Sequence, residues 1–227
     1  MNPLDLSGQR VLVTQAQDFM GPALCRTLAE LGATVVADTT ELSAPGAAEA
    51  LVERAGALDA VVVNLALPAP ATAAEAVSDD EWRQVFDVLV HPMQRLVRAV
   101  LPQMQARRAG RIVLMGSAAA LKGMARRSSY AAARGAQLAY IQALGVEVAP
   151  QGIRVNAVAQ NFVDNPTYFP PEVQANPAFQ ARLKWQVPLG RLVSAEEDTR
   201  FVAYLLSGAA DCFVGQVFPI CGGWVTR

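Results

Sequence analysis

Six short runs of apolar, mostly β-branched residues recur along the chain, and longer segments with helical spacing of apolar residues separate them. The first run, 10–14, reads Arg-Val-Leu-Val-Thr and is continuously apolar at its centre, which is typical of a strand buried on both faces. This alternation of strand and helix predicts a parallel, doubly wound sheet with right-handed crossovers. The expected strands are 10–14, 33–38, 59–64, 111–115, 153–158 and 215–220.

The segments between the strands carry start and stop signals of helices. Gly32 is suited to end the first helix, and the acidic residues after Ser78 open a long helical stretch over 79–108. Pro92 and Pro102 are expected to bend or split that stretch. The other expected helices are 21–31, 47–55, 128–149 and 194–206. Residues 160–185 form an aromatic- and proline-rich excursion between the last two of these helices.

Composition bounds the class of protein. With 52% hydrophobic and 17% charged residues, residues 1–227 are expected to bury the core of a single Rossmann-like α/β domain. A formal net charge of −1 provides no basic surface for nucleic acid or for a membrane. No apolar run reaches the ~18 residues of a membrane span, and the N-terminus lacks the apolar core of a signal peptide. Three scattered cysteines are typical of a reducing compartment, so a cytoplasmic protein is expected.

Three polar features follow expected strands, at the edge where ligands bind in an open parallel sheet. Ser117 comes shortly after the strand 111–115. Tyr130 and Arg134 are four positions apart near the start of the next helix, so they share one helical face. The loop 159–163 follows another strand. The sequence therefore predicts a site at this edge that contains a hydroxyl, a phenol and a guanidinium group.

Ser117 precedes a Tyr-x-x-x-basic pair by thirteen residues, a pattern that resembles the short-chain dehydrogenase/reductase family, and the similarity extends to the closing segment 215–223. In that family the fourth residue after the tyrosine is lysine, whereas this chain has Arg134. Ser-Tyr-Arg in this arrangement resembles the halohydrin dehalogenases, which share the fold and use no nucleotide. The resemblance implies catalytic roles for Ser117, Tyr130 and Arg134.

The turn after the first strand distinguishes the two families. A dehydrogenase has the pattern T-G-x-x-x-G-x-G there, because a pyrophosphate needs close approach of the backbone. This chain reads Thr-Gln-Ala-Gln-Asp-Phe-Met-Gly over 14–21, so Gln15 and Phe19 stand at two of the three glycine positions. Two further cofactor motifs are replaced, by residues 64–67 and 160–161. No nucleotide cofactor is expected.

The resemblance also implies a reaction. A vicinal haloalcohol would close to an epoxide and release halide, and a small anion would open an epoxide in the reverse direction. Tyr130 is expected to be the general base, with its pKa lowered by Arg134, while Ser117 holds the substrate oxygen. The loop 160–163 is expected to bind the halide through backbone N–H groups. The expected pocket residues are Phe19, Gln160, Asn161, Phe162, Val163, Tyr168 and Phe169.

Two alternatives stay open. The chain could be an NAD(P)-dependent oxidoreductase with an unusual glycine loop, which tight nicotinamide binding would support. It could also be a non-catalytic relative, in which Tyr130→Phe would change nothing except stability. The only histidine, His91, is interpreted as structural, and no metal site is expected. Asp38 and the pairs 107–108 and 126–127 are interpreted as solvent-facing charges.

The helical segments 79–108 and 128–149 carry more apolar surface than one face of a sheet covers. By the same family resemblance, such helices meet their copies across two-fold axes, so a homotetramer is expected. The closing segment 222–225 is expected to approach a neighbouring subunit.

Overall fold

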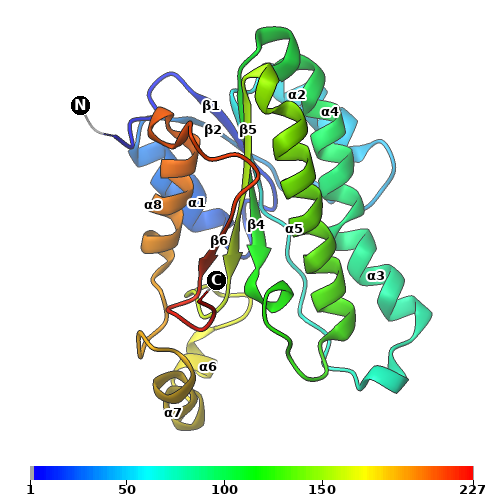
Figure 1. The fold of residues 1–227 in the computed structure, drawn as a ribbon, viewed down its shortest axis with the longest axis vertical. Helices are drawn as coiled ribbons and strands as arrows, with labels where there is room; N and C mark the ends of the chain where they lie inside the picture. Colours follow the sequence, from blue (N-terminus) through cyan, green and yellow to red (C-terminus); the bar gives the residue numbers. More distant parts are fainter. Residues whose placement is uncertain (1–2, 227) are drawn as a thin grey trace.

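The computed structural model describes residues 3–226 and contains a six-stranded sheet between two layers of helices (Figure 1). The strand order is β2-β1-β3-β4-β5-β6, and all neighbouring strands are parallel. The strands are β1 (Arg10–Val13), β2 (Thr34–Ala37), β3 (Ala60–Val63), β4 (Gly110–Ser117), β5 (Ile153–Gln160) and β6 (Val217–Ile220). The predicted α/β class with a Rossmann-like doubly wound sheet is confirmed.

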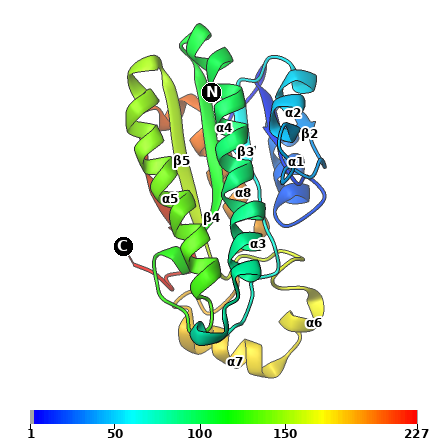
Figure 2. The ribbon, with the colours of Figure 1, turned by 90° about the vertical axis from the view of Figure 1, so that its right-hand side faces the viewer.

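Helices cover both faces of this sheet. The helices are α1 (Gly21–Glu30), α2 (Ala47–Ala55), α3 (Asp79–Leu89), α4 (His91–Arg107), α5 (Ser128–Val148), α6 (Pro171–Gln174), α7 (Pro177–Gln186) and α8 (Ala195–Leu206). The buried residues of α1 and α8 pack on one face, and those of α2, α4 and α5 pack on the other. Figure 2 shows α6 and α7 beyond the carboxyl ends of the strands, where the expected excursion lies. Short 3₁₀ turns occur at Ala74–Ala76, Ala118–Ala120, Ala149–Gln151 and Gly208–Ala210.

The two longest strands extend further than the sequence pattern predicted. They end at residues 117 and 160 instead of 115 and 158, so Ser117 closes β4 and Gln160 closes β5. The two residues are also register partners. The apolar pattern ended early because both residues are polar. A consequence is that rigid strand backbone holds both side chains at the carboxyl edge of the sheet.

The prolines of the long helical stretch act differently from each other. The stretch splits at Val90, and α4 begins with His91 and Pro92, where a missing N–H costs no helical hydrogen bond. Pro102 lies inside α4 and does not end it. His91 contacts Asp87 one turn earlier, with 2.8 Å between Nδ1 and Oδ1, at the surface.

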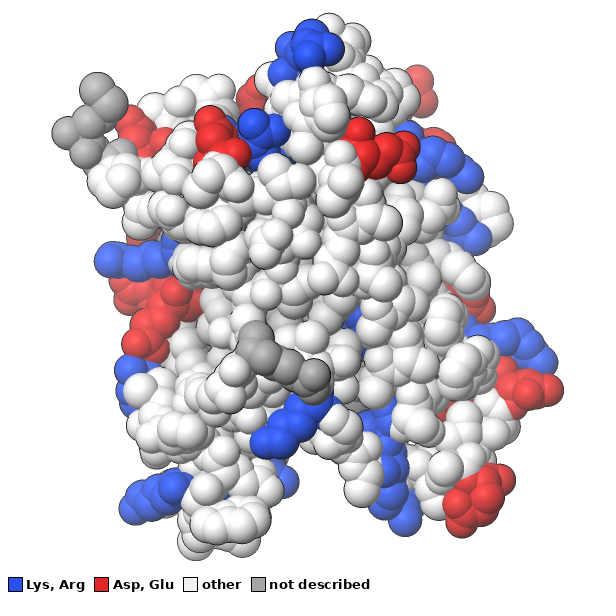
Figure 3. All heavy atoms as spheres, in the orientation of Figure 1, with Lys and Arg blue, Asp and Glu red and all other residues white. Residues whose placement is uncertain are grey.

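The surface carries its charges unevenly. In Figure 3 the charged side chains lie mostly around the outline of the molecule, and the centre of this face, over β5 and α5, is largely uncharged. On α5, Val146 is 69% exposed. The homotetramer stays a prediction.

Within residues 3–226, none of the helices combines the length and the apolarity that crossing a membrane requires.

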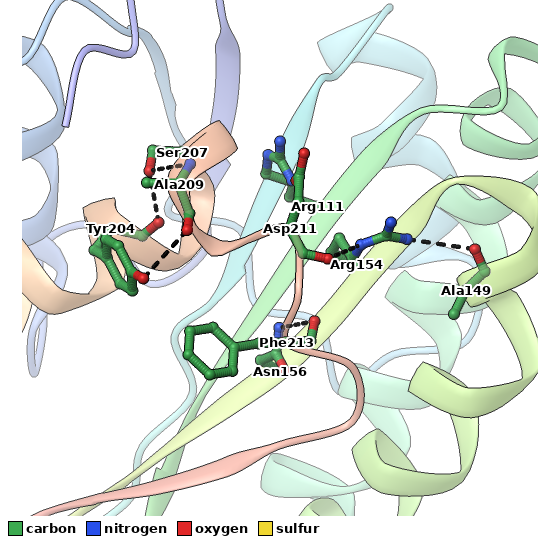
Figure 4. Close-up of polar contacts among 9 residues, drawn as sticks. All are labelled: Arg111, Ala149, Arg154, Asn156, Tyr204, Ser207, Ala209, Asp211 and Phe213. Carbon is green, nitrogen blue, oxygen red and sulfur yellow. Dashed lines mark hydrogen bonds and ion pairs between the residues drawn. The ribbon is translucent and has the colours of Figure 1, made fainter. Parts of the chain in front are cut away.

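A polar network fixes the amino-terminal edge of the sheet (Figure 4). Arg111, at the start of β4, pairs with the carboxylate of Asp211 at 2.7 Å, and Arg154 of β5 donates to the Asp211 carbonyl at 2.7 Å. Asn156 donates to the carbonyl of Phe213 at 3.1 Å. These bonds tie the connection between α8 and β6 to the central strands, at the edge opposite to the expected site.

A capping box opens α8. Ser194 Oγ accepts from the N–H of Glu197 at 3.1 Å, and the Glu197 carboxylate accepts from the N–H of Ser194 at 2.8 Å. Ser194→Ala is therefore expected to lower the free energy of unfolding by about 1 kcal/mol. Urea denaturation should show a lower midpoint with an unchanged m value. Ser128→Ala, at the start of α5 where no side chain caps the helix, is the control and should leave the midpoint unchanged.

Candidate active site

A cavity of about 250 Å³ opens at the carboxyl edge of the sheet, between the ends of β4 and β5, the start of α5 and the segment leading into α7. Nine of the ten residues that the sequence predicted for the site line it. They are Phe19, Ser117, Tyr130, Gln160, Asn161, Phe162, Val163, Tyr168 and Phe169. The tenth, Arg134, lies behind Tyr130 and is fully buried. The predicted residues are thus brought together around one cavity.

Tyr130 and Arg134 are in direct contact on α5, as their spacing predicted. Nε of Arg134 donates to the phenol oxygen of Tyr130 at 3.1 Å. Nη1 donates to the carbonyl of Met115 at 3.1 Å and to the amide oxygen of Gln137 at 3.0 Å. These three bonds fix the guanidinium against the end of β4. Ser117 Oγ accepts from the N–H of Ala119 at 3.2 Å, which leaves its own proton to donate.

The guanidinium of Arg134 has no carboxylate partner within the described chain. A buried charge is normally paired, because transfer out of water into the interior is costly. Its Nη2 is also buried without a hydrogen-bond partner among residues 3–226. The ionisable groups that influence Arg134 electrostatically are the phenols of Tyr130 and Tyr168. The site is therefore built to favour a negative charge on a phenol.

The phenols of Tyr130 and Tyr168 have different hydrogen-bond partners. Tyr168 donates its proton to the carbonyl of Leu67 at 2.9 Å, and its oxygen lies 3.3 Å from that of Tyr130. A phenol has one proton, so Tyr130 donates to Tyr168 while both are neutral. Once Tyr130 has lost its proton, Tyr168 can turn its own proton toward the phenolate. Tyr168 is thus a donor available to the ionised state.

The pKa values of the two phenols shift in opposite directions. Burial opposes ionisation of Tyr130, but the charge of Arg134 and hydrogen bonds with Tyr168, Arg134 and Ser117 outweigh it, so the pKa of Tyr130 is lowered from 10.0. Burial and the neighbouring charge of Tyr130 raise the pKa of Tyr168. Pairs of groups whose pKa values are driven apart are typical of acid–base sites. Tyr130 is the member suited to act as a base.

The loop 160–163 offers fewer backbone donors than the sequence-based interpretation assumed. The N–H of Asn161 donates to the carbonyl of Ile220 at 3.1 Å, and the N–H of Phe162 donates to Oδ1 of Asn161 at 2.9 Å. Both groups are therefore occupied. In the described part of the chain, the N–H of Val163 and the side-chain amide of Gln160 have no hydrogen-bond partner. These two groups are the available donors of the loop.

The turn after β1 has the backbone shape of a glycine loop but carries side chains. Gln15 and Phe19 have φ values of 44° and 53°, which glycine adopts freely and other residues rarely. The Phe19 side chain is buried, and its ring meets Tyr168 edge-on with 5.4 Å between centroids. Asn64 donates to the carbonyl of Gln15 at 3.0 Å and fixes the turn.

Two of the backbone donors that a pyrophosphate could use at this turn are already bonded. The N–H of Phe19 donates to Oγ1 of Thr167 at 3.0 Å, and the N–H of Ala16 donates to the carbonyl of Asp38 at 2.9 Å. The second residue of α1 is Pro22, which has no N–H to offer at the helix N-terminus. The residues of the turn therefore do not fit a nicotinamide dinucleotide.

Asp38 and Arg127 were interpreted from the sequence as solvent-facing charges, but the first is buried and the second is half-buried. Asp38 is buried at the end of β2, and its carboxylate accepts from the N–H and the hydroxyl of Thr40, each at 2.9 Å, because the chain turns back there. Arg127 is half-buried, lines the cavity and donates to the carbonyls of Ala69 and Pro70. Its position three residues before Tyr130 could have indicated that it lies near the site, since residues three apart share a helical face.

Other lining residues had no clear signal in the sequence. Trp224 lies in the closing segment that was expected to approach a neighbouring subunit, yet its ring packs edge-on against Phe162 of the same chain at 5.9 Å. Arg182 and Gln186 come from α7, inside the excursion. Arg127 and Arg182 are the charged residues among the described residues that line the cavity.

Comparison with known proteins shows which family the chain resembles in sequence and in fold. The family profile described as Enoyl-(Acyl carrier protein) reductase matches residues 4–225. The 3-oxoacyl-[acyl-carrier-protein] reductase FabG of Pseudomonas aeruginosa is 35% identical, in an alignment that covers 97% of this chain and 98% of that protein. A solved structure described as "Dehalogenation enzyme" is 33% identical with a TM-score of 0.91, over 97% of this chain and 99% of that one. An NAD-bound 3-oxoacyl-[acyl-carrier protein] reductase from Brucella melitensis is 25% identical with a TM-score of 0.86, over 98% and 94%.

The fold and the site define an α/β protein in which a serine at the end of a central strand and a tyrosine of the following helix line one cavity at the carboxyl edge of a parallel sheet. The extent of the profile match gives the family, and the chain belongs to the short-chain dehydrogenases/reductases. It departs from the pattern of the family's oxidoreductases at Arg134 and at the turn that contains Gln15 and Phe19.

Proposed function

We propose that this protein is a halohydrin dehalogenase, which closes vicinal haloalcohols to epoxides and releases halide without a nicotinamide cofactor. The observation that carries the proposal is the fully buried guanidinium of Arg134, which donates to the phenol of Tyr130 and has no carboxylate partner among residues 3–226. A fixed positive charge at that position favours the phenolate, and a phenolate is a base for an alcohol proton. No redox partner is needed for such a reaction.

The proposed step transfers no hydride. The Tyr130 phenolate takes the proton of the substrate hydroxyl, whose oxygen accepts a hydrogen bond from Ser117. That oxygen then forms a bond to the neighbouring carbon, the carbon–halogen bond breaks, and the halide leaves with the electron pair. The cavity holds the reacting atoms in line, which supplies much of the rate. Tyr130 returns its proton to solvent before the next turnover.

The leaving halide needs hydrogen-bond donors and a cavity wall from which water is partly excluded. The N–H of Val163 and the amide of Gln160 are the candidate donors, and the rings of Phe19 and Phe162 are apolar neighbours on the cavity wall. The same donors would hold a small anion that opens an epoxide in the reverse direction. The resemblance to the "Dehalogenation enzyme" structure supports this assignment.

Halide release is the direct test. Purified protein, without added cofactor, is expected to release halide from vicinal chloro- and bromoalcohols, followed with a halide-specific assay and by epoxide formation. Added NADH or NADPH should change neither the rate nor the melting temperature, because a bound cofactor would stabilise the protein. A broad panel of such alcohols that released no halide would remove the proposal.

A second candidate is an NAD(P)-dependent oxidoreductase, which the identity to the reductase of Pseudomonas aeruginosa favours. It requires the turn 14–21 to rearrange, since the side chain of Phe19 and the bond from its N–H to Thr167 occupy the turn. Nicotinamide binding with substrate-dependent absorbance change in the same preparation would establish this candidate instead.

A further inference from the structure

A further buried ionisable group lies beneath the cavity. Asp198, in the first turns of α8, is fully buried, and neither of its carboxylate oxygens has a hydrogen-bond partner within the described chain. Gln160 is also buried, and both polar atoms of its side-chain amide lack a partner there. Buried polar atoms are rarely left unpaired, because each has lost its bonds to water. Four such atoms on two side chains need an explanation.

The two side chains approach each other from facing elements. Val158 of β5 packs in the same apolar cluster as Val202 of α8, and alternate residues of a strand point to the same face. Gln160 therefore points toward α8. Its amide is close enough to lower the pKa of the Asp198 carboxyl, although the pair does not reach hydrogen-bond geometry. Because Gln160 also lines the cavity, Asp198 lies directly behind the cavity wall.

In the part of the chain that the structure describes, no charged group forms an ion pair with the Asp198 carboxyl. The other titratable or charged residues of α8, and those of α1, the helix packed against it, are Glu196, Glu197, Arg200, Tyr204, Cys25, Arg26 and Glu30. All except Cys25 and Tyr204 are exposed at the surface, and these two are half-buried. The nearby strands β4 and β5 end in the uncharged residues Ser117 and Gln160. Burial therefore dominates and raises the pKa of Asp198 to about 7.

The two protonation states of Asp198 require different orientations of the Gln160 amide. A neutral carboxyl donates to the amide oxygen, which leaves the amide N–H groups for the cavity. An ionised carboxylate accepts from those N–H groups, so they turn away from the cavity. Ionisation also adds a negative charge behind the loop 160–163. Both changes act against an anion in the cavity.

We propose that Asp198 is a positioning residue for the Gln160 amide and that ionisation of Asp198 weakens the binding of small anions at the loop 160–163. The inference rests on the proposed function, since it takes that loop as the anion site. It adds a dependence on the carboxyl of α8, which does not touch the reacting atoms.

Bromide binding tests the proposal directly. The protein has three tryptophans, of which Trp82 and Trp185 are exposed and Trp224 lines the cavity. With Trp82→Phe and Trp185→Phe in place, the fluorescence of Trp224 reports on the cavity alone. The bromide Kd is expected to rise about tenfold from pH 6 to pH 8, because a carboxyl that titrates near 7 changes from mostly neutral to mostly ionised. In Asp198→Asn the Kd should stay the same at both values.

Two further variants make the result specific. Glu196→Gln, an exposed acid of the same helix that pairs with Arg200, is the matched control and should keep the tenfold change. Tyr130 also ionises, so the series is repeated with Tyr130→Phe, in which the dependence on Asp198 should persist. A tenfold change retained in Asp198→Asn on the Tyr130→Phe background would overturn the inference and leave the proposed function intact. Absence of bromide binding at both pH values would also overturn it, whereas the proposed function falls only with halide release itself.

Discussion

Replacing Tyr130 with phenylalanine is expected to lower kcat for halide release by about 10²–10⁴-fold, the range for loss of a general base. The phenol oxygen is the group placed to take the substrate proton, and phenylalanine has no atom there. The ring itself stays, so packing in the core and its contact with Arg134, 5.2 Å from the ring centroid, should be retained. Initial rates of halide release, with the melting temperature measured on the same samples, check both statements.

The control for this variant is another tyrosine of the same helix. Tyr140 is half-buried on α5 and does not line the cavity, so Tyr140→Phe should leave kcat unchanged. A Tyr130→Phe protein with wild-type kcat would show that Tyr130 is not the base. Tyr168 would then be the next phenol to examine, although its pKa is raised and its proton is held by Leu67.

The sequence predicted the parts of this molecule that local rules determine. The pattern of apolar runs predicted the parallel sheet, and the four-residue spacing predicted the contact between Tyr130 and Arg134. The backbone conformation of the turn after β1 was predictable from its alignment with the glycine motif of the family. Gln15 and Phe19 stand at glycine positions of that motif and have the left-handed φ values of those glycines. Nine residues of the cavity were predicted with the help of the family resemblance, which assigns roles to positions after strands, near the start of α5 and in the aromatic segment.

What the sequence could not predict depends on contacts between distant elements. Asp198 follows Glu196 and Glu197 in a helix start that is rich in acids, and nothing in that pattern indicates that one of the three points inward. Its burial results from the packing of α8 against α1 and β4. Arg182 reaches the cavity only because the excursion folds back over the carboxyl edge. Local periodicity carries no information on either contact.

Replacing Arg134 with methionine is expected to reduce halide release at pH 7 by roughly 10–100-fold and to move the pH–rate profile to higher pH. Burial raises the pKa of Tyr130, and the charge of Arg134 is the largest opposing influence. An opposite charge at this distance lowers a pKa by about one to three units. Without it, Tyr130 titrates at higher pH, the phenolate fraction at neutrality falls, and the rate falls with that fraction. The profile of kcat/KM against pH measures the shift, and activity should partly return in alkaline solution.

The control and a conservative variant separate charge from geometry. Arg127→Met removes a cation that also lines the cavity but donates to backbone carbonyls, so it should leave the position of the pH profile unchanged. Arg134→Lys keeps the charge, but one ammonium cannot reproduce the Nε bond to Tyr130 together with the Nη1 bonds to Met115 and Gln137. Its profile should therefore lie between those of the wild type and Arg134→Met. A lysine variant with the profile of the wild type would mean that charge alone sets the pKa of Tyr130. The additional hydrogen bonds of the Arg134 guanidinium would then stabilise the fold instead of the phenolate.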